Sequence, residues 1–209
     1  MKTVYFLFLF ITFQLFVQAQ NDQGLDVKNH LIAQLDNEKL AFKFYHAMYD
    51  RWNILALKNL AKCEERHIKV VEKLICEFND QQSPMNLGEE NFNNQKYNAI
   101  YHDLISRGTK SENEALIAAG SFEESFIVNI EYLSNHSDTQ VQKDCLDNLL
   151  ESTIEHLNLL VCHLKHRNIE YKPSVLSVAK YIHCIGDQYA DFSQASHGCS
   201  LRDPPGKCP

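Results

Sequence analysis

The segment LKNLAKCEERHIKVVEKLI, residues 57–75, carries the pattern that decides the fold. Its apolar residues recur every three or four positions, the spacing that gathers side chains on one face of an α-helix. Glu64 and His67 fall within that apolar face and form Glu-x-x-His. This spacing sets a carboxylate beside an imidazole, so that both can reach one metal ion. The segment therefore predicts an amphipathic helix with a polar pair on its buried face.

Helical periodicity continues on both sides of this segment, and neither strand-like alternation nor hairpin dipeptides such as Asn-Gly interrupt it. The sequence therefore predicts an all-α fold. We expect long helices over residues 29–51, 54–79, 111–134 and 138–167.

The chain between the second and third long helices is richer in Asn, Gly and Pro and predicts a crossover. Short helical stretches near 92–106 and 111–119 lie within it, and the third long helix can absorb the second stretch, with Gly120 as a weak point. The fourth helix is expected to open at Ser137 or Asp138 as N-cap. Two antiparallel helical hairpins joined by a crossover form a ferritin-like four-helix bundle, which we place over residues 29–178.

The N-terminus has the composition of a secretory signal. Lys2 supplies a positive start, and residues 4–17 form an apolar run that only Thr12 and Gln14 interrupt. The run is short for a membrane span, and no second apolar run of spanning length follows. We expect a signal peptide over residues 1–19, a mature chain from about Gln20, secretion, and no membrane association after signal removal.

Charge excludes one class of partner. The chain has 20 Lys and Arg against 27 Asp and Glu, a net charge of −7, and its basic residues form no stripe. Nucleic-acid sites need a concentrated basic surface. We therefore expect no nucleic-acid partner.

Seven cysteines follow the signal, and an oxidising destination predicts disulfides among them, although the odd number leaves at least one unpaired or intermolecular. Cys63 and Cys76 fall on one predicted helix, and Cys145 and Cys162 on another. This permits cross-helix disulfides without fixing the pairing. Residues 179–209 form a C-terminal tail that contains Cys, Pro and Gly. The segment from Ser193 is predicted to pack as a loop, in which Cys199 and Cys208 either close a small ring or stay free. Asn135 begins a glycosylation sequon, which matters if the source is a eukaryote.

Placing each ionisable residue on its helix identifies further polar side chains on the apolar faces. Glu38 lies among Leu31, Leu35 and Tyr45 and therefore points inward. Of two adjacent glutamates on the third helix, Glu123 lies beside the apolar stripe and Glu124 opposite it, toward solvent.

The fourth helix interrupts its leucine stripe with Thr153 and His156. Glutamate is rarely buried without a partner or a metal. Three inward glutamates and two histidines thus favour a metal site, while a metal-free buried polar network is the alternative. Tyr45 either supplies hydrogen bonds or an electron route at the site, or is plain core.

Several sequence blocks then resemble one known family. Asn37–Ala41, Tyr45–Trp52 and Cys63–His67 look like the strings EEEKLA, VYLALYEKW and SEQRH of the bacterial and archaeal ferritin-like group called domain of unknown function 2202. Later, Phe122–Glu124, residues 153–157 and Tyr171–Pro173 are similar to its IEE, SRNHL and YEP. The resemblance covers roughly residues 30–178. It implies a ferritin-like bundle with a two-metal centre at Glu38, Glu64, His67, Glu123 and His156.

Two departures bear on the implied centre. Phe126 stands where the family has an aspartate, and Thr153 stands where a ferritin or rubrerythrin has the glutamate of a second Glu-x-x-His. Three glutamates carry three negative charges against the four positive charges of two divalent ions, so one ion, or none, suits the same residues.

Two functions remain open on the sequence. The first is a secreted protein with one or two iron or manganese ions and an oxidoreductase or metal-handling role. The second is a metal-free, disulfide-stapled secreted bundle with a binding or structural role. The sequence leaves the oligomeric state undefined.

Overall fold

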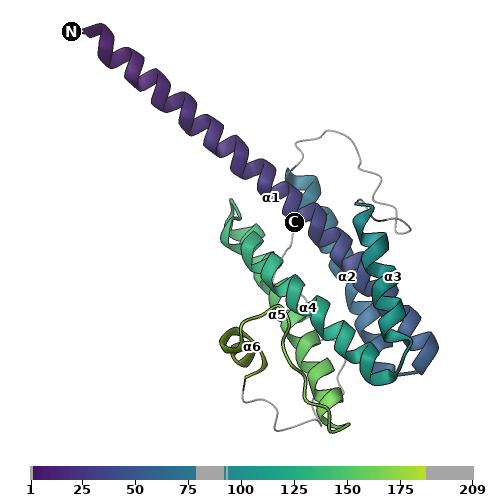
Figure 1. Cartoon of the computed structure of the whole chain (residues 1–209). Coiled ribbons are helices and arrows are strands. Elements are labelled where there is room, and N and C mark those ends of the chain that lie inside the picture. Colours follow the sequence, from purple (N-terminus) through teal and green to yellow (C-terminus); the bar gives the residue numbers. More distant parts are fainter. Residues whose placement is uncertain (1, 79–91, 93, 187–209) are drawn as a thin grey trace.

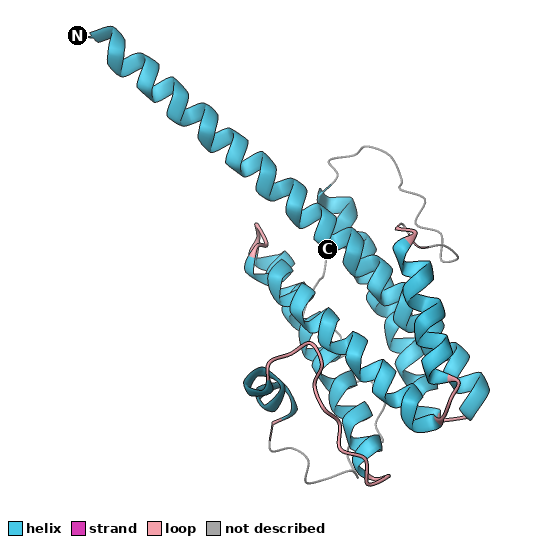
Figure 2. Cartoon of the chain, viewed as in Figure 1, coloured by secondary structure: helices cyan, strands magenta, loops and turns pink. Residues whose placement is uncertain are grey.

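The structure is a computed structural model that describes residues 2–78, 92 and 94–186, with side chains from Asp26 onward. Figure 2 shows helices and loops, and no strand occurs within these ranges, which confirms the predicted all-α class. The helices are α1 Lys2–Trp52, α2 Leu55–Phe78, α3 Lys96–Gly108, α4 Glu112–Asn135, α5 Gln140–Lys165 and α6 Val178–Ile185.

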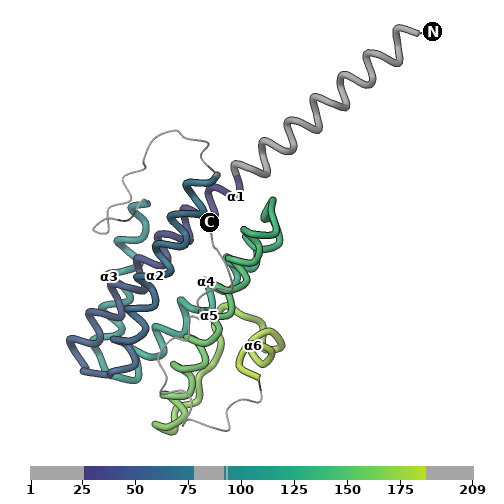
Figure 3. Tube along the Cα trace, turned by 180° about the vertical axis from the view of Figure 1, so that it is seen from behind, coloured from purple at the N-terminus to yellow at the C-terminus, as the bar shows by residue number. Residues whose placement is uncertain are grey.

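Two helical hairpins make the body of the molecule. α1 lies along α2, α4 lies along α5, and α1 also contacts α4 while α2 contacts α5 (Figures 1 and 3). The first hairpin turns within two residues, where Asn53 adopts a left-handed backbone conformation with φ of 54°. The apolar stripes of all four helices meet in one core, which includes Leu35, Leu57, Ile130 and Leu160.

Helix ends differ from the expected ones in two places. α1 begins at Lys2, so it runs without a break through the residues predicted to be a secretory signal. From Asp26 onward, where the structure describes the side chains, no helix has the length and apolar character that a bilayer span requires. α5 begins later than expected, because Thr139 rather than Ser137 or Asp138 caps it, accepting a hydrogen bond from the Gln142 amide at 3.2 Å.

A short helix lies at the start of the C-terminal tail, whereas the segment from Ser193 that was predicted to be a loop lies outside the described residues. α6 occupies Val178–Ile185, with Ser177 as its N-cap, and buries Tyr181 and Cys184. α6 contacts α5. Apolar residues four positions apart would have indicated this helix, but at only eight residues the signal is weak.

The cross-helix disulfides that the sequence permits are absent from four of the described cysteines. Cys63, Cys76, Cys162 and Cys184 form no disulfide. Cys145, by contrast, is disulfide-bonded. Cys199 and Cys208, and the ring they were expected to close, lie outside the described residues.

Gly120 is required by close packing and not by flexibility. A Cβ atom at this position would lie 2.6 Å from Cε2 and 2.8 Å from Oη of Tyr171. The Tyr171 hydroxyl donates a hydrogen bond to Glu124, so the ring cannot easily move aside. Gly120 thus lets the chain beyond α5 lie directly on α4.

We expect Gly120→Ala to destabilise the protein. Alanine favours a helix over glycine by about 1 kcal/mol, but overpacking a fixed core site costs about 1–3 kcal/mol, so the net effect is a loss. Urea unfolding of the variant measures it. In a Tyr171→Ala background the same substitution should become stabilising, and a stabilising effect beside the intact tyrosine would contradict this account.

Candidate metal centre

Four helices each turn ionisable side chains into the same part of the core. α1 contributes Glu38, α2 contributes Glu64 and His67, α4 contributes Glu123, and α5 contributes His156. No side chain of the five is more than 2% exposed. The structure therefore brings together all five residues that the sequence predicted to face inward.

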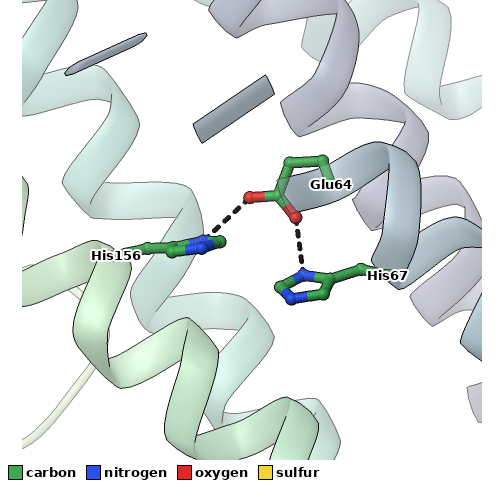
Figure 4. Close-up of side chains that lie close together, drawn as sticks. All are labelled: Glu64, His67 and His156. Carbon is green, nitrogen blue, oxygen red and sulfur yellow. Dashed lines mark hydrogen bonds and ion pairs between the residues drawn. The ribbon is translucent and has the colours of Figure 1, made fainter. Parts of the chain in front are cut away.

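The five side chains form two similar halves around Glu64. In one half, His67 Nδ1 lies 2.8 Å from Glu64 Oε2 and 3.3 Å from Glu38 Oε2. In the other, His156 Nδ1 lies 2.9 Å from Glu64 Oε1 and 3.5 Å from Glu123 Oε1. Figure 4 shows Glu64 reaching the two imidazoles with its two different oxygens. Each half thus has one imidazole, one carboxylate of its own and one oxygen of the shared carboxylate.

Burial and mutual contact shift the proton affinities in opposite directions. Burial raises the pKa of Glu38 to about 8, and the Glu64 carboxylate adds to the rise. Burial also works to raise the pKa of Glu64, but His156 and His67 outweigh it and hold that pKa below its usual range. For His67, burial favours the neutral form, but Glu64 and Glu38 raise its pKa to about 10. Burial raises the pKa of Glu123, against the influence of His156.

Several oxygens at the centre are poorly satisfied. Glu38 Oε2, Glu64 Oε1 and Glu123 Oε2 accept no well-oriented hydrogen bond from the part of the chain that the structure describes. Leaving buried acceptors without hydrogen bonds is costly. Glu64, His67 and His156 each offer a ligand atom, and these atoms lie within 4.8 Å of one another. A divalent cation held by carboxylates and imidazoles would satisfy these groups, so the residues fit such an ion.

Neighbouring polar side chains hold three of the five in place. Ser152 Oγ lies 3.0 Å from His67 Nε2, and the Gln34 amide donates to Glu38 Oε1 at 2.6 Å. Tyr45, fully buried, donates a hydrogen bond to Glu123. Burial and the adjacent Glu123 raise the pKa of Tyr45 well above its usual range, so it remains a donor. Such outer partners fix the orientation of metal ligands.

Sequence reasoning assigned no role to Gln34 and did not single out Ser152. Gln34 precedes Glu38 by one helical turn and Ser152 precedes Thr153, so each lay beside a residue already under consideration. Neither residue type is diagnostic, and only the approach of two helices reveals the Ser152 contact.

The two positions where a carboxylate was missing take no part in the centre. Thr153 is buried, but its hydroxyl donates to the Leu149 carbonyl of its own helix at 2.9 Å. Phe126 is buried and stacks on Phe122, with ring centroids 5.4 Å apart. Aromatic surface thus occupies the place where a fourth carboxylate would face the site.

The prediction that Glu124 points to solvent is wrong. Its side chain is fully buried and accepts hydrogen bonds from the Tyr171 hydroxyl and from the backbone amides of Ser174, Val175 and Leu176. The helical wheel placed Glu124 correctly on the face opposite the α4 stripe. It failed because the chain after α5 covers that face as well.

The other acidic residues near the centre lie at or close to the surface. Glu131 is half-buried and pairs with Lys180 of α6, and Glu155 is exposed. Glu65 Oε1 lies 3.0 Å from Lys69 Nζ, and its side chain is 50% exposed.

Comparison with known proteins finds relatives over most of the chain. The chain is 29% identical over 154 residues to the uncharacterized protein MJ0754 of Methanocaldococcus jannaschii. The matched segment spans 74% of this chain and 83% of that protein. The crystal structure of hypothetical protein MJ0754 from Methanococcus jannaschii matches with a TM-score of 0.69 and covers 76% of this chain and 90% of that chain. Residues 27–187 match the family described as an uncharacterized protein domain, DUF2202. Because this match spans well over half of the sequence, the chain belongs to the DUF2202 family.

Proposed function

We propose that this chain is a secreted ferritin-like protein that holds one or two iron or manganese ions and has an oxidoreductase or metal-handling role. The ligands would be Glu38, Glu64, His67, Glu123 and His156. The observation that carries the proposal is the buried cluster of Glu64, His67 and His156, with ligand atoms within 4.8 Å of one another. Secretion rests on the apolar run after Lys2.

The arrangement of ligands around Glu64 is suited to two ions. Its two oxygens face different imidazoles, and each imidazole also faces a second carboxylate, Glu38 or Glu123. A shared carboxylate between two histidine–carboxylate pairs is how helical bundles hold paired metal ions. Three carboxylates leave one positive charge of two divalent ions to be neutralised by hydroxide or another anion.

Bound iron or manganese would supply one- or two-electron chemistry with dioxygen or peroxide. The chain's own residues have simpler tasks. Glu38, Glu64 and Glu123 neutralise positive charge, and the imidazoles of His67 and His156 complete the ligand set. The outer hydrogen bonds from Gln34, Ser152 and Tyr45 fix the orientation of that set, and the apolar core around it limits the access of water.

A metal-free bundle with a binding or structural role is the second candidate, and the imidazole–carboxylate contacts favour it. A protonated His67 beside an ionised Glu64 compensates charge without any ion. Disulfide stapling, the other half of that candidate, has less support, since Cys145 is disulfide-bonded but the other four described cysteines form no disulfide.

Metal loading separates the two candidates. We expect the purified protein, stripped with a chelator and then given ferrous or manganous ion without oxygen, to retain about one to two ions per chain by mass spectrometry. Binding should release protons, because His67 must lose its proton to act as a ligand, and it should raise Tm. Ligation by five buried groups should be tight. Retention of less than about a tenth of an equivalent of metal would therefore contradict the metal proposal.

A further inference from the structure

Polar side chains occur at every fourth residue along one side of α1. Asp26, His30, Gln34 and Glu38 follow one another at this spacing, which stacks side chains along a helix. Asn129 of α4 faces them. We refer to Asp26, His30, Asn129 and Gln34 as the polar seam. The exposed fraction falls along it, from 54% at Asp26 and 36% at His30 to 0% at Gln34, so the seam runs from solvent into the core.

The contacts along the seam are continuous. His30 Nε2 lies 3.9 Å from Asp26 Oδ1, and His30 Nδ1 lies 2.5 Å from Asn129 Oδ1. The Asn129 amide nitrogen donates to Gln34 Oε1 at 2.8 Å. The Gln34 amide nitrogen donates to Glu38 Oε1 at 2.6 Å. Every step from the surface to the candidate centre therefore offers a polar atom.

The outer end of the seam gathers groups that attract cations. The Tyr132 hydroxyl donates a hydrogen bond to Asp26. The Tyr132 ring stacks between His30 and His136, with ring centroids 4.1 Å apart on each side. One carboxylate and two imidazoles therefore lie near the Tyr132 ring at the surface. Carboxylates and imidazoles are both ligands of divalent transition metals.

The inner end of the seam is a carboxylate with an unsatisfied oxygen. Glu38 Oε1 accepts from Gln34, whereas Oε2 faces His67 and accepts no well-oriented hydrogen bond from the described residues. Glu38 is 0% exposed. The seam thus ends on a buried oxygen directed into the candidate centre.

Aromatic rings pack beside the centre where α1 meets α4. Tyr45 packs edge-on against Phe122, and Phe122 stacks on Phe126, each pair with ring centroids 5.4 Å apart. All three rings are no more than 5% exposed. Apart from the Tyr45 hydroxyl, these rings offer a hydrated cation no ligand, so the polar seam is the better-supplied approach.

We infer that the polar seam is the access route by which a divalent metal cation reaches the centre from solvent, an inference that rests on the proposed function. Oxygen and nitrogen atoms along the seam replace water around the ion one at a time. Conduction requires sites that attract an ion yet release it, and neutral amides at Asn129 and Gln34 meet that need better than carboxylates would. The same amides make a poor proton wire, because an amide neither gains nor loses a proton readily near neutral pH.

The test compares loading rates of two double variants in the full chain. Asp26→Ala with His30→Ala removes the outer end of the seam. Asp50→Ala with His46→Ala is the matched control, since these two residues are also four apart on α1 and exposed. Stopped-flow mixing with cobaltous ion, followed by its visible absorption, gives the loading rate. Mass spectrometry gives the final metal content.

We expect the seam variant to load at least about tenfold more slowly, within the range by which local charge alters association rates, and to reach the same final content as the wild type. The control should load within about twofold of the wild-type rate, as expected of charges remote from the route. Equal rates in both variants, with normal content, would overturn the route and leave the metal centre standing. Absence of metal from the wild type would overturn the proposed function and the route together.

Discussion

Glu64→Gln is expected to abolish metal retention. Glu64 is the one side chain that contacts both imidazoles, so its replacement affects both halves of the centre. The amide has nearly the same shape but carries no charge and has only one oxygen ligand. We expect the affinity to fall by more than the roughly 10–100-fold that follows from losing a hydrogen-bond partner of a metal ligand. Metal content after loading and desalting measures the effect.

Glu65→Gln is the matched control for this variant. It makes the same chemical change one residue away, at a side chain that is 50% exposed and pairs only with Lys69 among its described salt bridges. This control should retain metal like the wild type. Glu64→Gln should also destabilise the metal-free protein, by about 3–5 kcal/mol, because it leaves a charged His67 buried beside a neutral amide. Retention of metal by Glu64→Gln at the wild-type level would refute the central role of Glu64.

Glu124→Ala is expected to destabilise the protein more than other substitutions outside the centre. The substitution removes the acceptor of the Tyr171 hydroxyl and of three backbone amides. A hydrogen bond to a charged group contributes about 1.5–3 kcal/mol, so we expect a total loss of about 3 kcal/mol or more. For a chain of this size that corresponds to a fall in Tm of about 6–12 °C, which calorimetry measures.

Two further variants show whether this carboxylate is responsible. Tyr171→Phe removes one of the hydrogen bonds and should cost about 1.5 kcal/mol. Glu131 lies on the same helix as Glu124 and forms a half-buried ion pair with Lys180 of α6. Glu131→Ala removes this ion pair and should cost less than about 1 kcal/mol. If Glu124→Ala cost no more than Glu131→Ala, the hydrogen bonds to residues 174–176 would have no energetic importance.

Helical periodicity predicted the long helices and the inward direction of all five candidate ligands. It succeeded because each lies in a run of apolar residues long enough to define a buried face, as Glu64 does between Leu60 and Ile68. Boundaries were less accurate. The start of α5 depends on which of several adjacent polar side chains caps it, and Ser137, Asp138 and Thr139 all have suitable side chains.

The contacts of Glu124 and Ser152 could not be predicted in the same way. A wheel drawn for one helix assumes that the side away from the core meets water, whereas residues 171–176 cover that side of α4. Ser152 meets His67 across 85 positions of sequence. Both contacts depend on how separate segments approach one another, and no local pattern records that.

The hydrogen bonds of Glu124 also set a lower limit on the length of chain that can fold. Glu123 and Glu124 are adjacent, yet one faces the centre and the other binds the backbone of residues 174–176. A polypeptide ending after α5 would keep every candidate ligand. It would, however, lack the backbone that covers Glu124 and would leave that carboxylate exposed on α4. The autonomous folding unit therefore extends at least to Leu176, eleven residues beyond the last residue of the α5 helix at Lys165.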